Sequence, residues 1–284
     1  MKVGYSKADI TPSTPQYVCG HAMRDGKSTG VHDPLELCVL WLELDDKKIC
    51  FINADLIMMS FNFCDEVRTK IANTYKTKVE YIILTVTHTH SGPNFNDHNS
   101  NMMPGSKEYI DFVKHTIYQA VSNAEASIQD FDNTTVVKGL INGYYGNRND
   151  IKKDGDKWAY LVKFNAGDKT LMALANLSCH STVINPNELQ FSADLLGNIR
   201  HYLEDSLNIP ILITNGSAGD MSNRQYREGN DWLALDNISK GIGKQILNFT
   251  EMIQVNLNPV VANTFEYRVN YDLDVDEIKM KLDK

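Results

Sequence analysis

Strand-like and helix-like apolar segments alternate along most of this chain, and that alternation is what most limits its possible folds. Segments rich in β-branched or aromatic residues suit strands, and they lie at 35–44, 49–55, 81–87, 134–141, 158–164, 171–177 and 209–214. Other segments carry apolar residues three or four positions apart, which is typical of helices that bury one face, and they lie at 63–75, 112–124, 195–202 and 232–246. The interleaved order predicts a mixed α/β (α+β) fold of layered sheets with flanking helices.

The segments continue without a repeat, a low-complexity tract or a linker. With 284 residues, of which 42% are hydrophobic, the chain is long enough to bury a substantial core. We therefore expect one catalytic domain over residues 1–284. The stretch 166–169, which reads AGDK between two strand segments, predicts a hairpin turn. The polar stretch between Phe95 and Ser106 is placed to cover a site.

Charge and composition exclude several classes of protein. A net charge of -8, from 36 acidic and 28 basic residues, argues against nucleic-acid binding and leaves no polybasic patch for anionic lipid. The first residues do not resemble a signal peptide, and no apolar run is long enough to span a membrane. We expect a cytoplasmic protein without a transmembrane segment. The five cysteines are scattered, mostly within apolar stretches, which indicates buried, reduced thiols.

A pair of histidines follows one of the apolar strand segments. Residues 81–93 read YIILTVTHTHSGP, and extended geometry would point His88 and His90 to the same side. Two neighbouring neutral imidazoles suit Zn²⁺, which favours nitrogen ligands. The alternative is that both are polar loop residues satisfied by hydrogen bonds.

A second strand segment also delivers a histidine to its end. It runs into Cys179 and His180, and sites in open α/β sheets assemble at the carboxyl ends of strands. Alternation turns Cys179 away from His180, so we expect a core thiol there. A third segment, 211–223, reads ILITNGSAGDMSN, and its Ser222 is either a nucleophile or a loop or helix-capping serine.

Short stretches of the chain occur in the same order as the motifs of one enzyme family. These stretches are 4–11, 29–35, 53–56, 87–93, 147–148, 179–182, 192–194 and 219–222. Through them the chain resembles the neutral, non-lysosomal ceramidases, clearly over residues 3–223 and weakly as far as residue 271. The THTHSGP stretch is the most specific of the motifs.

The resemblance implies a zinc-dependent amidase that acts on small or lipid-like N-acyl substrates. It implies that His88 and His180 bind zinc, that His90 lies beside the metal-bound water, and that Arg148 faces the substrate amide. Ser222 corresponds to a serine once considered the nucleophile, a role that a zinc-activated hydroxide makes unnecessary. The family's glutamate and tyrosine ligands would follow Lys284, so the chain is expected to be a fragment and a poor catalyst alone.

Other readings of these residues remain open. Asp55, Asp194 or Asp220 could complete the metal site, and Asp55 or Asp194 could bond the far nitrogen of a ligand histidine. Asp194 is equally suited to cap a helix, and His32 is expected to pair with Asp33. The other functional readings are a non-catalytic metal-binding module and a serine amidase that uses Ser222. The oligomeric state is not indicated by the sequence.

Overall fold

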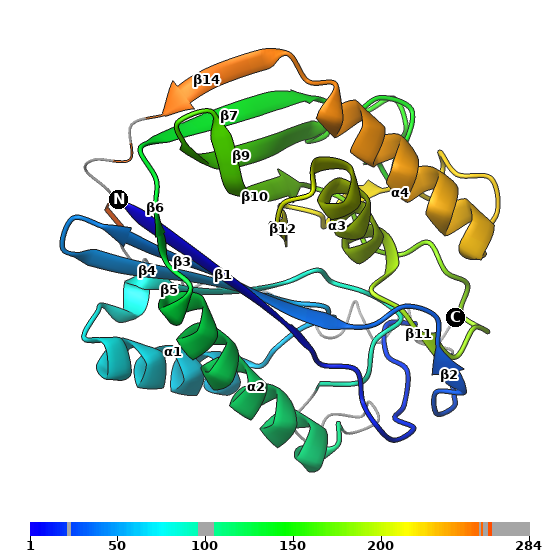
Figure 1. Cartoon of the computed structure of the whole chain (residues 1–284). Helices are drawn as coiled ribbons and strands as arrows, with labels where there is room; N and C mark the ends of the chain where they lie inside the picture. The colour runs from blue at the N-terminus through cyan, green and yellow to red at the C-terminus, as the bar shows by residue number, and fades with distance from the viewer. Residues whose placement is uncertain (22–23, 96–104, 256, 258–260, 263–284) are drawn as a thin grey trace, which may run out of the picture.

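Two five-stranded sheets lie face to face, and helices cover their outer faces (Figure 1). This arrangement comes from a computed structural model, which describes residues 1–21, 24–95, 105–255, 257 and 261–262. The stretch expected to cover a site lies largely outside these described residues. The layered arrangement confirms the predicted mixed α/β fold.

The first sheet has the strand order β5-β4-β3-β1-β6. Its strands β1, β3 and β4 are antiparallel neighbours, whereas β5 pairs with β4 in parallel. Helix α1 connects β4 to β5, and α2 follows β5. The bounds are β1 Lys2–Asp9, β3 Glu36–Leu44, β4 Lys47–Ala54, α1 Phe61–Tyr75, β5 Ile82–Val86, α2 Lys107–Ala126 and β6 Gln129–Asp130.

The second sheet repeats this connectivity. Its order is β12-β10-β9-β7-β14; β7, β9 and β10 are antiparallel neighbours, and β12 pairs with β10 in parallel. Helix α3 connects β10 to β12, and α4 follows. The bounds are β7 Asn133–Leu140, β9 Trp158–Ala166, β10 Lys169–Leu177, α3 Asp194–Leu207, β12 Ile211–Asn215, α4 Trp232–Leu247 and β14 Glu251–Val255. Each half is thus three antiparallel strands, a helix, a parallel strand and a helix.

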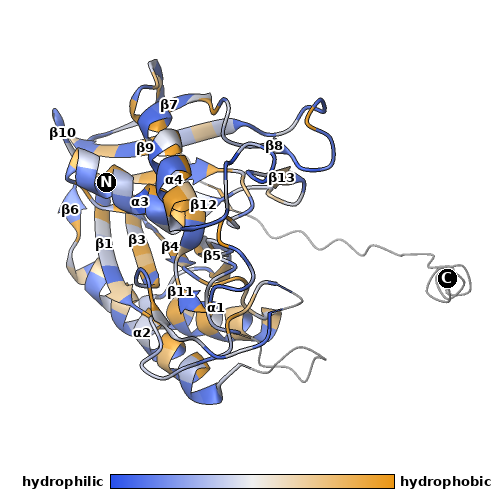
Figure 2. Ribbon diagram, turned by 90° about the vertical axis from the view of Figure 1, so that its right-hand side faces the viewer, coloured by the Kyte–Doolittle hydropathy of each residue, from blue (hydrophilic) through white to orange (hydrophobic). Residues whose placement is uncertain are grey.

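Three apolar clusters hold the four layers together. One fills the space between the two sheets and includes Leu40 of β3 and Met172 of β10. A second packs α1 and α2 against the first sheet, and a third packs α3 and α4 against the second. Figure 2 shows the hydrophobic residues of these strands and helices in a view turned by 90°. Burial on both faces explains why the central strands are nearly continuous apolar runs.

Most predicted elements are present within a few residues of their expected ends. The hairpin turn joins β9 to β10, with Gly167 at a φ of 59°. The elements that were not predicted are β1, β6, β14 and the short elements β2 Gly30–Val31, η1 Val79–Tyr81, β8 Gly146–Asn147, β11 Gln190–Phe191 and β13 Met221–Ser222. All five cysteines are free, and four of them are buried, which confirms the expected thiols. Within the described ranges, none of the helices has the length and apolar character needed to cross a membrane.

Candidate metal centre

The two sheets bring their strand ends together at one edge of the molecule. Strands β5 and β12, one from each sheet, lie next to each other. His88 follows the end of β5 and His180 follows the end of β10. The two loops are tied by a hydrogen bond from the His90 backbone N–H to the carbonyl oxygen of Ser181, 3.3 Å. The edge therefore contains histidines delivered by both sheets; the sequence predicted that they follow strand ends and lie close together.

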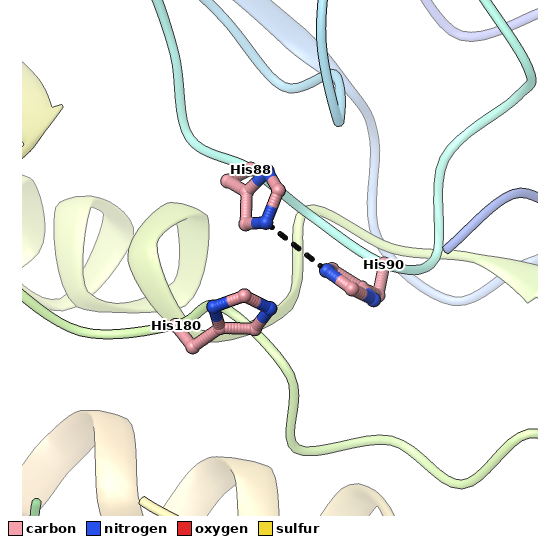
Figure 3. Close-up of side chains that lie close together, drawn as sticks. All are labelled: His88, His90 and His180. Carbon is pink, nitrogen blue, oxygen red and sulfur yellow. Dashed lines mark hydrogen bonds between the residues drawn. The ribbon is translucent and has the colours of Figure 1, made fainter. Parts of the chain in front are cut away.

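His88, His90 and His180 converge on one point (Figure 3). The Nε2 atoms of His88 and His90 are 3.2 Å apart, and the ligand atoms of all three histidines lie within 4.8 Å of one another. The ring centroids are separated by 4.6 to 4.8 Å. The expectation was that His88 and His90 point to the same side because the strand before them, predicted to end at residue 87, continues in extended geometry. The structure differs, since β5 ends at Val86 and His88 has a left-handed φ of 63°. Such a conformation is uncommon for a non-glycine residue and is typical of functional sites.

Backbone carbonyls fix the tautomers of two of these rings. His88 Nδ1 lies 2.8 Å from the Ile57 carbonyl oxygen and His180 Nδ1 lies 3.4 Å from that of Ala218. A carbonyl only accepts, so each Nδ1 carries the proton and each Nε2 keeps its lone pair. This is the outer hydrogen bonding that metal-binding histidines require. The imidazole nitrogens therefore fit a zinc ion.

The surroundings favour the neutral, metal-binding form of His90 and His180. Burial, with the nearby His88 and His180, lowers the pKa of His90 to about 3. Burial also lowers the pKa of His180, with contributions from His88, Arg148 and Arg224. Among the hydrogen bonds of the described residues, none involves the buried Nδ1 atom of His90. Neutral imidazoles bind a cation without first losing a proton.

A loop near the N-terminus packs directly against His90. Gly20 has a φ of 111°, and a Cβ atom there would lie 2.6 Å from the Cα and Cβ atoms of His90. Only glycine suits both this backbone conformation and this approach. The neighbouring Cys19 N–H donates to the carbonyl oxygen of Gly92, 2.9 Å. No pattern in the sequence marks Gly20 as part of the site.

One arginine joins three loops around His90. The guanidinium of Arg24 donates to the carbonyl oxygens of Cys19, His90, Asn185 and Pro186. Its planar fork of donors suits such a set of acceptors. No local sequence pattern marks Arg24, because its partners lie as far as 162 residues away.

A cavity of about 450 Å³ opens beside His88 and His180. The small residues that follow β12 leave space in this cavity. The lining residues are Thr85, Val86, His88, His180, Asn215, Gly216, Ala218 and Gly219. The histidine nitrogens thus border a space that a ligand can enter.

The carboxylates proposed to assist the metal site have other partners. Asp55 binds the buried Arg200, with oxygen–nitrogen distances of 2.7 and 3.2 Å. Asp194 accepts hydrogen bonds from the backbone N–H groups of Val183 and Ile184. Neither carboxylate bonds a histidine of the cluster. Both expectations for these residues are therefore wrong, because long-range partners compete for their oxygens.

Two further expectations for aspartates are also corrected. Asp194 does not cap α3, since the cap is Ala193 and its N–H donates to Asp33 at 2.8 Å. Asp220 is exposed and accepts a hydrogen bond from Asn147 at 3.3 Å. Among the described residues, the metal-binding group at this edge consists of the three histidines alone.

The remaining candidates are not part of this group. His32 pairs with Asp33 at 2.8 Å and stacks on Trp232, as a loop histidine is expected to do. Ser222 forms a backbone bridge with His180, and its hydroxyl accepts from the Arg224 N–H at 3.1 Å. Cys179 is fully buried, which raises the pKa of its thiol to about 12 and confirms a core thiol. Arg148 is exposed next to β8.

A second group of possible ligands lies on another face. Glu36, His201 and Glu204 have ligand atoms within 4.8 Å of one another. The Lys7 ammonium lies 3.2 Å from Glu36 and 2.9 Å from Glu204. The lysine already supplies the positive charge that a metal would bring, so we assign this group to ion pairing.

Comparison with known proteins agrees with the motifs and the fold. Residues 1–218 match the family model described as neutral/alkaline non-lysosomal ceramidase, N-terminal. The crystal structure of neutral ceramidase from Pseudomonas aeruginosa superposes with a TM-score of 0.76 at 20% identity, covering 87% of this chain and 44% of that one. A ceramidase complexed with C2 gives a TM-score of 0.77 at 18% identity, covering 87% and 43%. The chain thus spans about half the length of either protein, and it belongs to the neutral/alkaline non-lysosomal ceramidase family.

Proposed function

We propose that this protein is a zinc-dependent hydrolase of amide bonds in N-acyl, ceramide-like substrates. The convergence of His88, His90 and His180, with the Nδ1 atoms of His88 and His180 held by carbonyl groups, is the observation that carries this proposal. Membership of the ceramidase family and the ceramidase fold support the reaction class.

The residues have distinct roles in this proposal. His88 and His180 hold the metal, which when bound makes water a nucleophile at neutral pH by lowering its pKa towards about 7. His90, with its Nε2 atom 3.2 Å from that of His88, lies beside the position of a metal-bound water and would relay its proton. Arg148 stabilises the negative charge on the amide oxygen, a contribution on the order of a few kcal/mol.

A serine amidase that uses Ser222 is the weaker alternative. A nucleophilic serine needs a base within hydrogen-bonding reach. Among the described hydrogen bonds, the hydroxyl of Ser222 binds the backbone of Arg224, and the three histidines bind carbonyl groups and one another. A non-catalytic metal-binding module is the other alternative, and it predicts zinc binding without hydrolysis.

The length of the chain provides the first test of the proposed reaction. The family resemblance requires a glutamate and a tyrosine ligand from a later part of the polypeptide. Zinc held by histidines alone is less well fixed, and misplacement by about 1 Å can cost about 100-fold in rate. A chain extended beyond Lys284 is expected to hydrolyse N-acyl substrates in a chelator-sensitive way, and residues 1–284 only weakly.

Initial rates with and without a chelator measure this difference. An active-serine reagent distinguishes the alternative, because it would stop the serine amidase and leave the zinc hydrolase active. Strong chelator-sensitive hydrolysis by residues 1–284 alone would contradict the need for later ligands.

The second test concerns Arg148. Arg148→Ala in the extended chain is expected to lower kcat by about 10²-fold, by analogy with the loss of one oxyanion-stabilising donor. The free energy of unfolding should change by less than about 0.5 kcal/mol, because the side chain is exposed. Steady-state kinetics and urea denaturation measure the two quantities. A large loss of stability without a kinetic defect would show that Arg148 is structural.

A further inference from the structure

Two arginines extend from a short strip of backbone next to His180. Strands β8 and β13 pair with each other, with Ser222 opposite Gly146, and Ser222 also forms a bridge with His180. Arg148 directly follows β8, and Arg224 follows β13 by two residues. Both arginines therefore begin within a few residues of a metal-binding histidine.

Hydrogen bonds fix the backbone of both arginines. The Arg148 N–H donates to the Asp220 carbonyl oxygen at 2.7 Å, and the Arg224 N–H donates to the hydroxyl of Ser222 at 3.1 Å. The side-chain amide of Gln225 donates to the Arg148 carbonyl oxygen at 3.3 Å, which links the two segments. The positive charges of Arg148 and Arg224 both act on His180 and lower its pKa, although burial contributes more.

Neither side chain has an acidic partner. In the part of the chain that the structure describes, the guanidinium groups of Arg148 and Arg224 form no ion pair and no hydrogen bond, and both residues are exposed. By contrast, Lys7, Lys114 and Lys138 each lie within 3.0 Å of a glutamate oxygen. The two arginines at the candidate site thus remain available to bind a ligand.

Two more arginines add positive charge to the same region. Arg24 and Arg227 are partly buried, and their guanidinium groups donate to backbone carbonyls and, in Arg227, to the side-chain oxygen of Asn223. Those acceptors are neutral. The buried Asp194 acts on both arginines, but burial raises its pKa to about 7, so its charge is incomplete at neutral pH.

Four arginines thus lie around the candidate site of an acidic protein. The whole chain carries a net charge of -8, so unpaired arginines next to the candidate site stand out from the overall composition. Unpaired arginines a few residues from His180 are suited to binding carboxylate or phosphate groups, with which they form charge-assisted hydrogen bonds.

We propose that Arg224 binds an anionic group of the substrate, a carboxylate or a phosphate, a few bonds away from the amide that Arg148 faces. The preferred substrate is then an acidic N-acyl compound. The reaction at the amide rests on the proposed function, but the binding of the anionic group does not.

Three N-dodecanoyl probes test this proposal, because they share an acyl amide and differ in charge. N-dodecanoylglycine carries a carboxylate, N-dodecanoyl-O-phosphoethanolamine carries a phosphate, and N-dodecanoylethanolamine is neutral. Equilibrium dialysis against the full chain, with the intact probe measured on both sides, gives each Kd. At least one anionic probe is expected to bind about tenfold or more tightly than the neutral probe, and the stronger of the two identifies the group.

Arg224→Gln should remove most of this preference without changing the affinity for the neutral probe or the zinc content. The matched control is Lys169→Gln, which removes one exposed charge at the opposite end of β10 from His180. It should keep the full preference. Equal binding of the three probes to the unmodified chain, or an unchanged preference in Arg224→Gln, would overturn the proposal.

The two proposals can fail separately. An anion preference that depends on Arg224, in a chain that neither binds zinc nor hydrolyses amides when extended, would refute the proposed function alone. Zinc-dependent hydrolysis with no preference for charge would refute the anion site alone.

Discussion

Replacing His88 and His180 together by alanine is expected to abolish zinc binding by this chain. The unmodified chain should carry about one zinc ion, since its three imidazoles form a single group. Loss of an outer hydrogen bond to a metal ligand already lowers affinity by 10- to 100-fold. Loss of two ligands should therefore lower it by more than about 100-fold. Elemental analysis after gel filtration and a competitive zinc titration measure the stoichiometry and the affinity.

His32→Ala is the matched control, because it removes a histidine that pairs with Asp33 and stacks on Trp232 outside the group. It should leave the zinc content unchanged. The double variant should also keep its secondary structure, because His88 and His180 lie in loops beyond the strand ends. Full zinc occupancy in the double variant would disprove the proposed metal centre.

The alternation of apolar segments was sufficient to predict the layers of this fold. Its central strands and all four predicted helices bury apolar faces, and burial produces the periodicity that can be read from sequence. Strand β1 was missed because exposed polar residues interrupt its apolar ones. It also contains Gly4, at which a Cβ atom would meet the backbone of α2 at Ala124. Gly4 is therefore the one residue of β1 whose type reflects the close packing of α2 on this strand.

The repeated connectivity of the two sheets was not visible in the sequence. Strands β5 and β12 occupy equivalent positions, but the residues that follow them differ: THTHSGP after β5 and GSAGD after β12. A fold constrains which positions are apolar far more than it constrains which residues occupy them. Two halves can therefore share a topology while their loops supply different chemistry.

The site was predicted to the extent that its residues follow apolar strands. His88, His90 and His180 satisfy this condition, and the structure brings them together. Arg24 was missed because its acceptors come from three loops that are distant in sequence. The role of Asp55 was predicted incorrectly for the same reason.

Asp55 instead belongs to an ion-pair network that connects the two sheets. Its carboxylate follows β4 in the first half of the chain, and Arg200 lies on α3 in the second half. Both side chains are fully buried, and Arg200 also binds Glu36 at 2.8 Å. Burial alone would lower the pKa of Arg200, but Asp55 and Glu36 raise it well above its usual value.

Glu36 is charged in the same network. Burial opposes its ionisation, but the hydrogen bond from His201 and the charge of Arg200 lower its pKa to about 2. The guanidinium of Arg200 is therefore bound by two carboxylates, those of Asp55 and Glu36. Removing one of them leaves a buried positive charge only partly compensated, which is far more costly than losing an exposed ion pair.

Asp55→Asn is therefore expected to lower the free energy of unfolding by about 3–5 kcal/mol, out of the 5–15 kcal/mol typical of a globular protein. Lys7→Gln, which removes a partly exposed lysine from the same network, should cost only about 0–1 kcal/mol. Urea denaturation of both variants measures the difference. Zinc affinity should also fall in Asp55→Asn, because the flanking carbonyls of Ala54 and Leu56 accept the N–H groups of Thr87 and His88. Equal, small losses in the two variants would show that the buried pair does not hold the two halves together.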